Sequence, residues 1–308
     1  MYKVLVVMST FNGEKYLSEQ IDSILSQIGV DITLVIRDDG SKDRTTEIIK
    51  KYASKNNRIV PIYGRNIGFR KSFFNTLREY YSEDFDYYSF SDQDDVWMPE
   101  KLIKAIEALK KITDLNKGKL YASSLNVVDQ SLKPMYINSF TNLRVSYGSA
   151  LSRQRLAGCT MVFDSKIAKL CIKFDMDRYP EKLISHDGAV YYICLACGGN
   201  VYYDENSFIK FRRHTGTVTE HGRGVIKRVE SITNIFKEYR NTRYEQNKAL
   251  YETYHNEMTN EVKALSEKIM TYRNSLKSRL SLAMDKRIKC NLFVIDLVYW
   301  LAILLGCY

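Results

Sequence analysis

The segment that decides the fold is Tyr87-Tyr88-Ser89-Phe90-Ser91-Asp92-Gln93-Asp94-Asp95-Val96-Trp97. Its first four residues form a short apolar run that is typical of a buried parallel strand, and three carboxylates follow at once. Carboxylates this close repel one another unless a cation neutralises them. Oxygen ligands on a short loop suit Mg²⁺ or Mn²⁺ held jointly with substrate phosphates. The segment therefore predicts an acidic metal site after a strand; the alternative is that Asp94 or Asp95 only caps a helix starting near Pro99.

Four more short apolar runs lie in the first 125 residues, with helical patterns between them. The runs are Lys3–Met8, Ile32–Ile36, Ile59–Tyr63 and Leu120–Ser123. Apolar residues at helical spacing are Leu17, Ile21, Ile24, Leu25 and Ile28, then Ile48, Ile49 and Tyr52, then Leu102, Ile103, Ile106 and Leu109. Strands alternating with helices predict an α/β fold with right-handed βαβ units in a doubly wound sheet. Ligands of such sheets bind beyond the carboxyl ends of the strands.

The other predicted strand ends are also polar. The stretches that follow the first three runs contain Ser9–Gly13, Asp38–Ser41 and Arg65–Gly68. None is a G-x-G-x-x-G or a G-x-x-x-x-G-K-[ST] loop, so the usual dinucleotide and P-loop sites lose their main support. Turn and capping chemistry accounts for Gly40 and Ser41 but does not require Asp39, whose carboxylate could accept the imide N–H of uracil or thymine.

Net charge separates the chain into two parts. The 308 residues hold 46 Lys+Arg and 36 Asp+Glu, a net of +10. From Arg223 onward there are 15 basic and 9 acidic residues, a net of +6 in 86 residues. An apolar content of 45% with only 4 Pro excludes a disordered chain. Because the basic residues form no aromatic-interleaved stripe and the strand ends are acidic, we expect no nucleic-acid partner.

Together, Val6–Leu17, Arg37–Asp43 and Ser91–Trp97 carry a family resemblance that covers about residues 1–215. They resemble the family 2 glycosyltransferases with the GT-A fold, and the S-D-Q-D-D-V-W form is most similar to rhamnosyltransferase-type bacterial members that build surface polysaccharides. The resemblance implies a Rossmann-like mixed sheet flanked by helices, a GT-A catalytic domain that we place at residues 1–222. It also implies metal-dependent, inverting transfer of a hexose from a UDP- or dTDP-sugar to a glycan or lipid-linked acceptor.

The resemblance assigns the nucleotide and metal sites residue by residue. Thr10 and Phe11 would lie against the base and Asp39 would hydrogen-bond its edge, while Asn66, Gly68 and Lys71 would approach the diphosphate. Asp92 would lie near the ribose and Asp94 would ligate Mn²⁺ or Mg²⁺. Asp95 and Trp97 belong to the same motif, and whether Asp95 contacts metal, solvent or sugar stays open.

Downstream motifs complete the implied site. Gly158 and Cys159, in Leu156–Phe163, resemble the glycine-bearing segment beside the donor sugar. His186-Asp187 resembles the dipeptide whose acid is the general base, although an Asp there could simply be a helix N-cap. His214 would complete the metal site, the alternative being a structural histidine. Arg212 and Arg213 could clamp diphosphate, and the segment Thr215–Gly224 could close over the donor.

The tail, residues 223–308, has helical patterns. One stripe is Val225, Val229, Ile232, Phe236 and Tyr239, and another is Met258, Val262, Leu265, Ile269, Tyr272 and Leu276. They predict a helical subdomain packed on the catalytic domain of the same chain, with a homo-oligomer through these helices left open. A basic patch follows at Lys277, Arg279, Lys286, Arg287 and Lys289.

The apolar segment Leu292–Leu305 follows the basic patch and contains Asp296. It is too short to span a bilayer core of about 30 Å as a helix. We expect it to lie in an anionic membrane surface, which would make the protein cytoplasmic and peripheral on the inner face of the cell membrane. A core helix or an oligomer contact is the alternative.

Two other functions are consistent with these patterns. One is a processive polysaccharide synthase of the same fold, which the lack of a multi-span membrane region disfavours. The other is a non-enzymatic scaffold recruited to membranes through the helical tail.

Overall fold

The computed structural model describes residues 1–114, 116–140, 144–153, 156–214, 236 and 240–308. The chain divides into two compact units, each described here by itself. Unit 1 comprises residues 1–141, 156–194 and 199–214, and unit 2 comprises residues 142–155, 195–198 and 215–308. The predicted boundary after residue 222, the segment Thr215–Gly224 and, apart from Phe236, the stripe Val225–Tyr239 lie outside the described residues.

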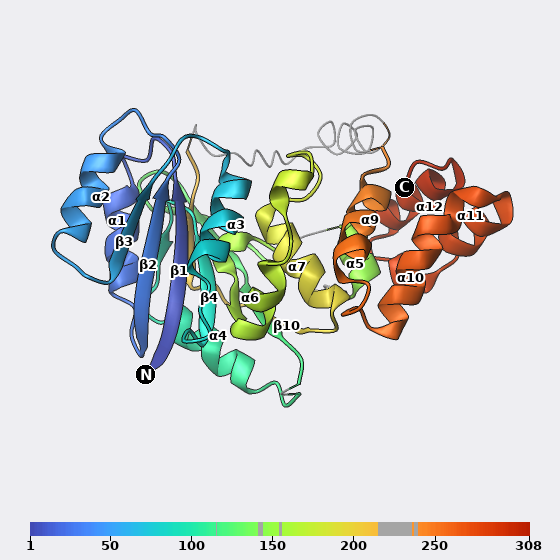
Figure 1. Ribbon diagram of the computed structural model, residues 1–308, viewed down its shortest axis with the longest axis horizontal. Helices are drawn as coiled ribbons and strands as arrows, with labels where there is room; N and C mark the ends of the chain where they lie inside the picture. Colours follow the sequence, from blue (N-terminus) through green and yellow to red (C-terminus); the bar gives the residue numbers. More distant parts are fainter. Residues whose placement is uncertain (115, 141–143, 154–155, 215–235, 237–239) are drawn as a thin grey trace. The chain divides into compact units, whose positions relative to one another are not determined.

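Unit 1 is built on a seven-stranded sheet in the order β10-β6-β9-β4-β1-β2-β3, of which Figure 1 shows β4, β1, β2 and β3 side by side. The strands are β1 (Tyr2–Thr10), β2 (Val30–Asp38), β3 (Ile59–Tyr63), β4 (Tyr87–Ser91), β6 (Lys119–Ser123), β9 (Val162–Asp164) and β10 (Asn200–Asp204). The five predicted apolar runs are all strands of this sheet. One strand of the sheet, β9, lies antiparallel between β4 and β6. The mixed sheet flanked by helices is confirmed.

Helices cover both faces of this sheet because successive strand residues point to opposite sides. On one face, Val4, Val6 and Met8 share a core with buried residues of α1, α2 and α4. On the other, Phe73 and Phe74 of α3 pack on the ring of Phe90 in β4, at centroid distances of 5.0 and 6.2 Å. The helices are α1 (Leu17–Leu25), α2 (Thr45–Ala53), α3 (Phe69–Tyr80), α4 (Lys101–Lys110), α6 (Ser165–Cys171) and α7 (His186–Ala196), with 3₁₀ turns η1 (Gly158–Thr160) and η2 (Met176–Arg178). The predicted helical faces are confirmed except at Ile28, which lies beyond α1 and is 52% exposed.

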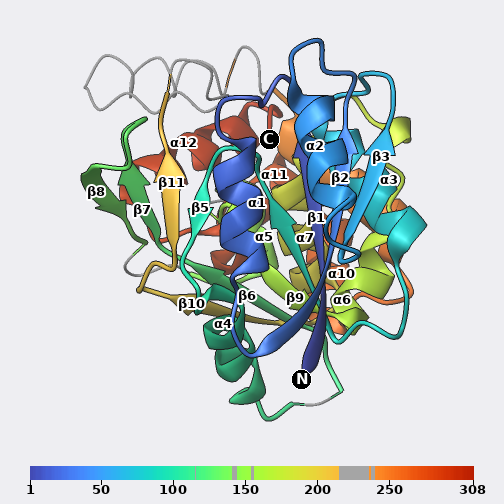
Figure 2. The same cartoon turned by 90° about the vertical axis from the view of Figure 1, so that its left-hand side faces the viewer.

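A second sheet, not predicted from the sequence, completes unit 1. Its order is β5-β11-β7-β8, and Figure 2 shows it beside α1. The strands are β5 (Val96–Trp97), β7 (Leu125–Val128), β8 (Pro134–Asn138) and β11 (Ile209–Arg212). Pairing of Ile209 with Trp97 and of Lys210 with Val96 brings the end of β11 next to the acidic loop after β4. This sheet therefore joins residues that are more than 100 positions apart.

Unit 2 is helical, as predicted for the tail. It contains α5 (Tyr147–Ser152), α9 (Thr242–Tyr254), α10 (Asn260–Thr271), η3 (Tyr272–Asn274), α11 (Leu276–Ala283), η4 (Lys286–Ile288) and α12 (Phe293–Leu304). The predicted stripe buries Leu265, Ile269 and Tyr272, but it stops there because Ser275 caps a new helix, which leaves Leu276 67% exposed. The sequence analysis had placed α5 with the catalytic domain, whereas Tyr147 donates to Asn247 Oδ1 of α9 at 3.0 Å. Among the described residues no helix has the length and apolarity needed to cross a membrane.

Candidate active site

The loops after β1 and β2 are joined by side-chain to backbone hydrogen bonds. The amide N–H groups of Asn12 and Gly13 donate to Ser41 Oγ and Thr45 Oγ1 at 2.9 and 2.8 Å. Asn12 Oδ1 in turn accepts from the Lys42 amide at 2.9 Å. These bonds hold the two carboxyl-terminal strand ends together, as expected for neighbouring parallel strands. They explain why this polar loop is rich in short hydrogen-bonding side chains.

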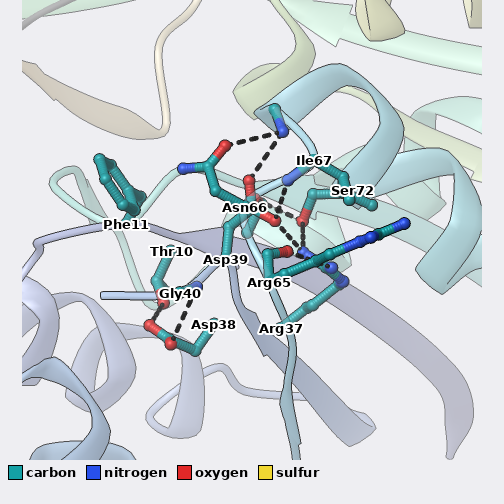
Figure 3. A network of polar contacts seen from close by, with 12 residues as sticks. Thr10, Phe11, Arg37, Asp38, Asp39, Gly40, Arg65, Asn66, Ile67 and Ser72 are labelled. Carbon is teal, nitrogen blue, oxygen red and sulfur yellow. Dashed lines mark hydrogen bonds and ion pairs between the residues drawn. The ribbon is translucent and has the colours of Figure 1, made fainter. Parts of the chain in front are cut away.

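Asp39 anchors the loop that follows β3 (Figure 3). Its Oδ1 accepts from the Ile67 amide at 3.0 Å and its Oδ2 from the Gly68 amide at 2.9 Å. It also forms an ion pair with Arg37, which donates further to Ser72 Oγ and to the Arg65 carbonyl. Asp39 is 2% exposed. A carboxylate has about four acceptor positions, so one on Oδ2 stays available for a nucleotide base.

The remaining nucleotide-side candidates surround this network. Thr10 is buried and its hydroxyl contacts Asp38 Oδ1 at 3.4 Å, whereas Phe11 presents a ring that is 44% exposed. Asn66 is exposed and its Oδ1 accepts from the Gly68 amide at 3.1 Å. Gly68 has a φ of 82°, which favours glycine where the chain enters α3. Phe11 and Asn66 therefore offer surface to a ligand, and Thr10 supports the loop from within.

The two predicted metal ligands meet at the end of β4. Asp94 Oδ2 lies 2.8 Å from His214 Nε2, although 120 positions separate the two residues. Both side chains are partly exposed, at 19% and 18%. Tyr16 packs on the imidazole of His214 at a centroid distance of 4.9 Å. The pairing of β11 with β5 therefore creates an oxygen and nitrogen donor pair facing solvent.

The acidic loop is electrostatically strained. Burial, followed by the charges of Asp94 and Asp187, raises the pKa of Asp92 to about 7. Burial and the same kind of repulsion raise the pKa of Asp95 well above its ordinary value. Asp95 Oδ1 accepts from the Arg212 amide at 3.1 Å, and its buried Oδ2 has no hydrogen-bond partner within the described part of the chain. Carboxylates in this state gain from a nearby cation.

Under the loop lies a buried lysine that the sequence analysis missed. Lys101 is 1% exposed, and its ammonium lies 3.5 Å from the centre of the Trp97 ring. Burial lowers the pKa of Lys101 to about 7, against the opposing charges of Cys159 and Asp95. Trp97 is itself 2% exposed, so it packs beneath the site and presents no wall to a ligand.

The donor set fits a hard divalent cation. Carboxylate oxygens and an imidazole nitrogen are suitable ligands for Mn²⁺ or Mg²⁺. The oxygens and sulfur of Asp92, Asp95 and Cys159 all lie within 4.8 Å of one another. Burial raises the pKa of the Cys159 thiol well above its ordinary value, so the protonated thiol is a poor ligand. Asp94 and His214, with Asp92 beside them, are therefore the residues that would hold the cation.

The predicted base stands at the start of α7. Asp187 is partly exposed and close enough to raise the pKa of Asp92. His186 is buried and stacks on Phe73 at a centroid distance of 4.4 Å, and burial lowers the pKa of its imidazole. A Cβ on Gly158 would lie 2.8 Å from His186 Nε2 and 3.0 Å from Asp187 Cβ. Only glycine lets the segment before β9 approach α7 this closely.

The basic candidates differ in what they contact. Arg212 is 3% exposed, and its guanidinium donates to the carbonyls of Asp94 and Gln130 at 2.8 and 2.7 Å and pairs with Glu19. Arg212 thus fastens β11 to the acidic loop, and each of its three guanidinium nitrogens already donates one hydrogen bond within the protein. Arg213 is partly exposed, and its Nε has no hydrogen-bond partner in the described part of the chain. Lys71 pairs with Asp177 at 2.8 Å.

Gln93 is a further site residue that sequence reasoning missed. Its Oε1 accepts from the Phe11 amide at 2.9 Å, and its Nε2 donates to the Phe11 carbonyl at 3.1 Å. The side chain therefore ties the acidic loop to the loop after β1. The sequence marks Gln93 only through its position between Asp92 and Asp94, because Phe11, which it contacts, lies 82 positions away.

Comparisons with known proteins bear on the family of the chain. The family model described as "Glycosyl transferase family 2" matches residues 5–170, more than half of the chain. A dTDP-rhamnosyl transferase, RfbG of Shigella flexneri, is 27% identical over 221 residues, which is 67% of this chain and 71% of that protein. An uncharacterised glycosyltransferase of Rickettsia typhi is 27% identical over 240 residues, 76% of this chain and 71% of that protein.

Solved structures of TarS from S. aureus share the fold. The complex of TarS residues 1–349 with UDP-GlcNAc has a TM-score of 0.56 and 17% identity, and the match covers 99% of this chain and 88% of that chain. The complex with UDP has a TM-score of 0.52 and 19% identity, and the match covers 92% and 76%. At this identity the likeness concerns the fold alone.

Proposed function

The chain belongs to glycosyl transferase family 2, and we propose that it is an inverting, metal-dependent hexosyltransferase acting in the synthesis of a cell-surface polysaccharide. The donor is a UDP- or dTDP-sugar, of the rhamnose type or another hexose, and the acceptor is a glycan or a lipid-linked glycan. The name of the Shigella relative, a dTDP-rhamnosyl transferase, and the UDP and UDP-GlcNAc complexes of TarS support a nucleotide-sugar donor.

The meeting of Asp94 with His214, next to the carboxylates of Asp92 and Asp187, carries the proposal. These groups come from three separate parts of the chain. The turns and helix caps that each part forms do not require the three parts to lie close together. In this proposal Asp187 accepts the proton of the acceptor hydroxyl while that oxygen bonds to the anomeric carbon. The nucleoside diphosphate leaves from the opposite side of the sugar, which inverts the anomeric configuration.

The chain's own groups also bind and orient the donor. The exposed ring of Phe11 and the free acceptor position of Asp39 suit a pyrimidine base. Arg213 offers a guanidinium for diphosphate. Mn²⁺ or Mg²⁺, when bound by Asp94 and His214, would stabilise charge on the departing diphosphate.

Calorimetry tests the donor and metal parts of the proposal. We expect purified protein to bind UDP or dTDP more tightly with Mn²⁺ than with EDTA, and a set of nucleotide sugars to reveal one that is hydrolysed only with the metal present. A non-enzymatic scaffold would show no metal-dependent nucleotide binding and no turnover.

The variant Asp187→Asn tests the assignment of the base. General-base catalysis contributes roughly 10²–10⁴-fold, so turnover should fall by at least about a hundredfold while donor affinity stays nearly unchanged. Asp31→Asn is the matched control, because Asp31 is exposed at the opposite end of β2. Unchanged turnover would refute the role of base, and lost donor binding would make Asp187 structural.

A further inference from the structure

The two helices that end the chain carry an apolar face that no described residue covers. On α12 the exposed side chains are Phe293, Val294, Leu297, Leu301 and, just past the helix, Leu305, with exposed fractions from 41% to 82%. Residues spaced by four lie on one side of a helix, so this side of α12 carries no charge. The opposite side is buried in unit 2 through Val298, Tyr299, Ala302 and Ile303.

The neighbouring helix α11 also exposes apolar side chains. Leu276, Leu280 and Met284 are spaced by four and are 67%, 45% and 70% exposed. The two helices lie side by side, and Arg279 of α11 donates to the Leu304 carbonyl at 3.1 Å. A hollow of about 360 Å³ opens between them, lined by Ala283, Ile288, Lys289, Phe293, Asp296, Leu297, Tyr299 and Trp300. We call these exposed residues and the hollow the apolar face.

Lysines next to this face have no acidic partner. Lys277, Lys286 and Lys289 are exposed, and none of them forms an ion pair with a described residue. The two acidic residues nearest these lysines, Asp285 and Asp296, contact other groups. Asp285 pairs with Lys268 and Arg287 at 2.8 and 2.7 Å, and Asp296 Oδ1 accepts from the Cys290 amide at 2.7 Å. Three exposed lysines therefore stand against the one carboxylate, Asp296, for which no ion pair with a described residue is seen, so the net charge around the apolar face is positive.

We propose that the apolar face docks onto an anionic lipid bilayer, with α11 and α12 lying in the interface and the lysines against lipid headgroups. An apolar helix side bordered by cations is the pattern of an interfacial anchor. A helix of 12 residues is about 18 Å long, well short of a bilayer core of about 30 Å, so α12 lies in the surface. A second copy fits less well, because a two-fold contact would place lysines against lysines.

Vesicle flotation of the full chain tests the proposal without donor or metal, so that its failure is distinct from failure of the sugar transfer. We expect binding to vesicles of phosphatidylglycerol and phosphatidylcholine, and weak binding to phosphatidylcholine alone. Brominated lipid should quench Trp300 fluorescence. The other tryptophan, Trp97, is buried in unit 1 and serves as the unquenched reference in a Trp300→Phe variant.

Two sets of substitutions separate the apolar and charged contributions. Leu297→Glu with Leu301→Glu should weaken binding by at least about a hundredfold, whereas Met135→Glu with Ile137→Glu, somewhat more exposed on β8, should leave it unchanged. Replacing Lys277, Lys286 and Lys289 by Gln should weaken binding to anionic vesicles by about a hundredfold. The control replaces the exposed Lys51, Lys55 and Lys111 of unit 1 by Gln.

Three results would overturn the proposal. The first is that the native chain does not float with anionic vesicles. The second is that a control variant loses as much binding as its test variant. The third is that the chain binds no lipid but sediments as a dimer, and that Leu297→Glu with Leu301→Glu abolishes this dimer. Thermal unfolding of each variant checks that the substitutions leave the fold intact, which is expected because the substituted leucines and lysines are exposed and Trp300→Phe keeps an aromatic ring.

Discussion

Replacing Asp39 by Asn should release the loop after β3 from the end of β2. The carboxylate accepts from two backbone amides, at Ile67 and Gly68, and balances the charge of Arg37, whose side chain is 11% exposed. An asparagine amide has one oxygen, so its NH₂ group must face either an amide donor or the guanidinium. One charge-assisted hydrogen bond is then lost, which costs about 1.5–3 kcal/mol.

The loss of the counter-charge adds to this cost. Removing one partner of a buried ion pair costs about 3–5 kcal/mol, but Arg37 keeps its bonds to Ser72 Oγ and the Arg65 carbonyl. Both costs arise from replacing the same carboxylate oxygen, so they do not add fully. We therefore expect the free energy of unfolding of the variant to fall by about 3 kcal/mol. The loss should show in urea unfolding and, locally, as faster hydrogen exchange of the Ile67 and Gly68 amides.

Asp38→Asn is the matched control on the neighbouring residue. Asp38 Oδ2 accepts from the Gly40 and Ser41 amides at 3.2 and 3.0 Å, and its Oδ1 faces the Thr10 hydroxyl. An asparagine can keep the first contacts with its oxygen and donate to the hydroxyl with its NH₂, so the cost should be about 1 kcal/mol or less. Equal losses in the two variants, or unchanged amide exchange in Asp39→Asn, would refute the reasoning.

Three further predictions concern the acidic loop and the base. Lys101→Met removes a lysine whose pKa is about 7 in the folded protein and 10.5 in the unfolded chain. The folded state therefore favours the neutral amine, and the stability that this lysine contributes is present above the unfolded pKa and lost as pH falls through the folded pKa. Chemical denaturation should therefore show native stability rising from pH 7 to 9 by about 2–3 kcal/mol more than that of the variant, and parallel curves would contradict the burial argument. Gly158→Ala places a Cβ 3.0 Å from Asp187 Cβ and should lower turnover at least tenfold with little change in nucleotide affinity. Unchanged turnover would show that the site accommodates this methyl group without displacing Asp187. His214→Gln should weaken Mn²⁺-dependent nucleotide binding about tenfold or more in calorimetry and leave metal-free binding unchanged, and equal loss in both conditions would argue against a ligand role.

Local patterns were sufficient to predict the strands and the acidic loop. Apolar runs such as Val4–Met8 and Leu34–Ile36 are buried on both faces of the sheet, so their composition alone marks them as central strands. Asp92, Asp94 and Asp95 stand out because charged residues rarely cluster directly after a buried strand. Both patterns lie within about ten consecutive residues, so they can be interpreted without knowing which distant segments of the chain contact them.

Long-range pairing decided the use of individual side chains. Arg212 and Arg213 are neighbours in the sequence, yet the buried Arg212 donates to the Asp94 carbonyl, whereas Arg213 Nε has no hydrogen-bond partner among the residues that the structure describes. The difference follows from the alternation of side chains at the end of β11, and β11 itself pairs with strands from residues 96 and 126. No local pattern specifies that pairing.

By itself, the sequence determined the family, the order of strands and helices, and the carboxylates at the strand ends, because these are properties of short segments. Only the tertiary structure decided that His214 meets Asp94, that α5 packs with the tail, and that the described residues leave one apolar side of α12 uncovered. Those outcomes depend on which distant surfaces pack together. Burial, and with it the pKa of Lys101 and the exposure of Leu297, is a property of that packing and not of residue type.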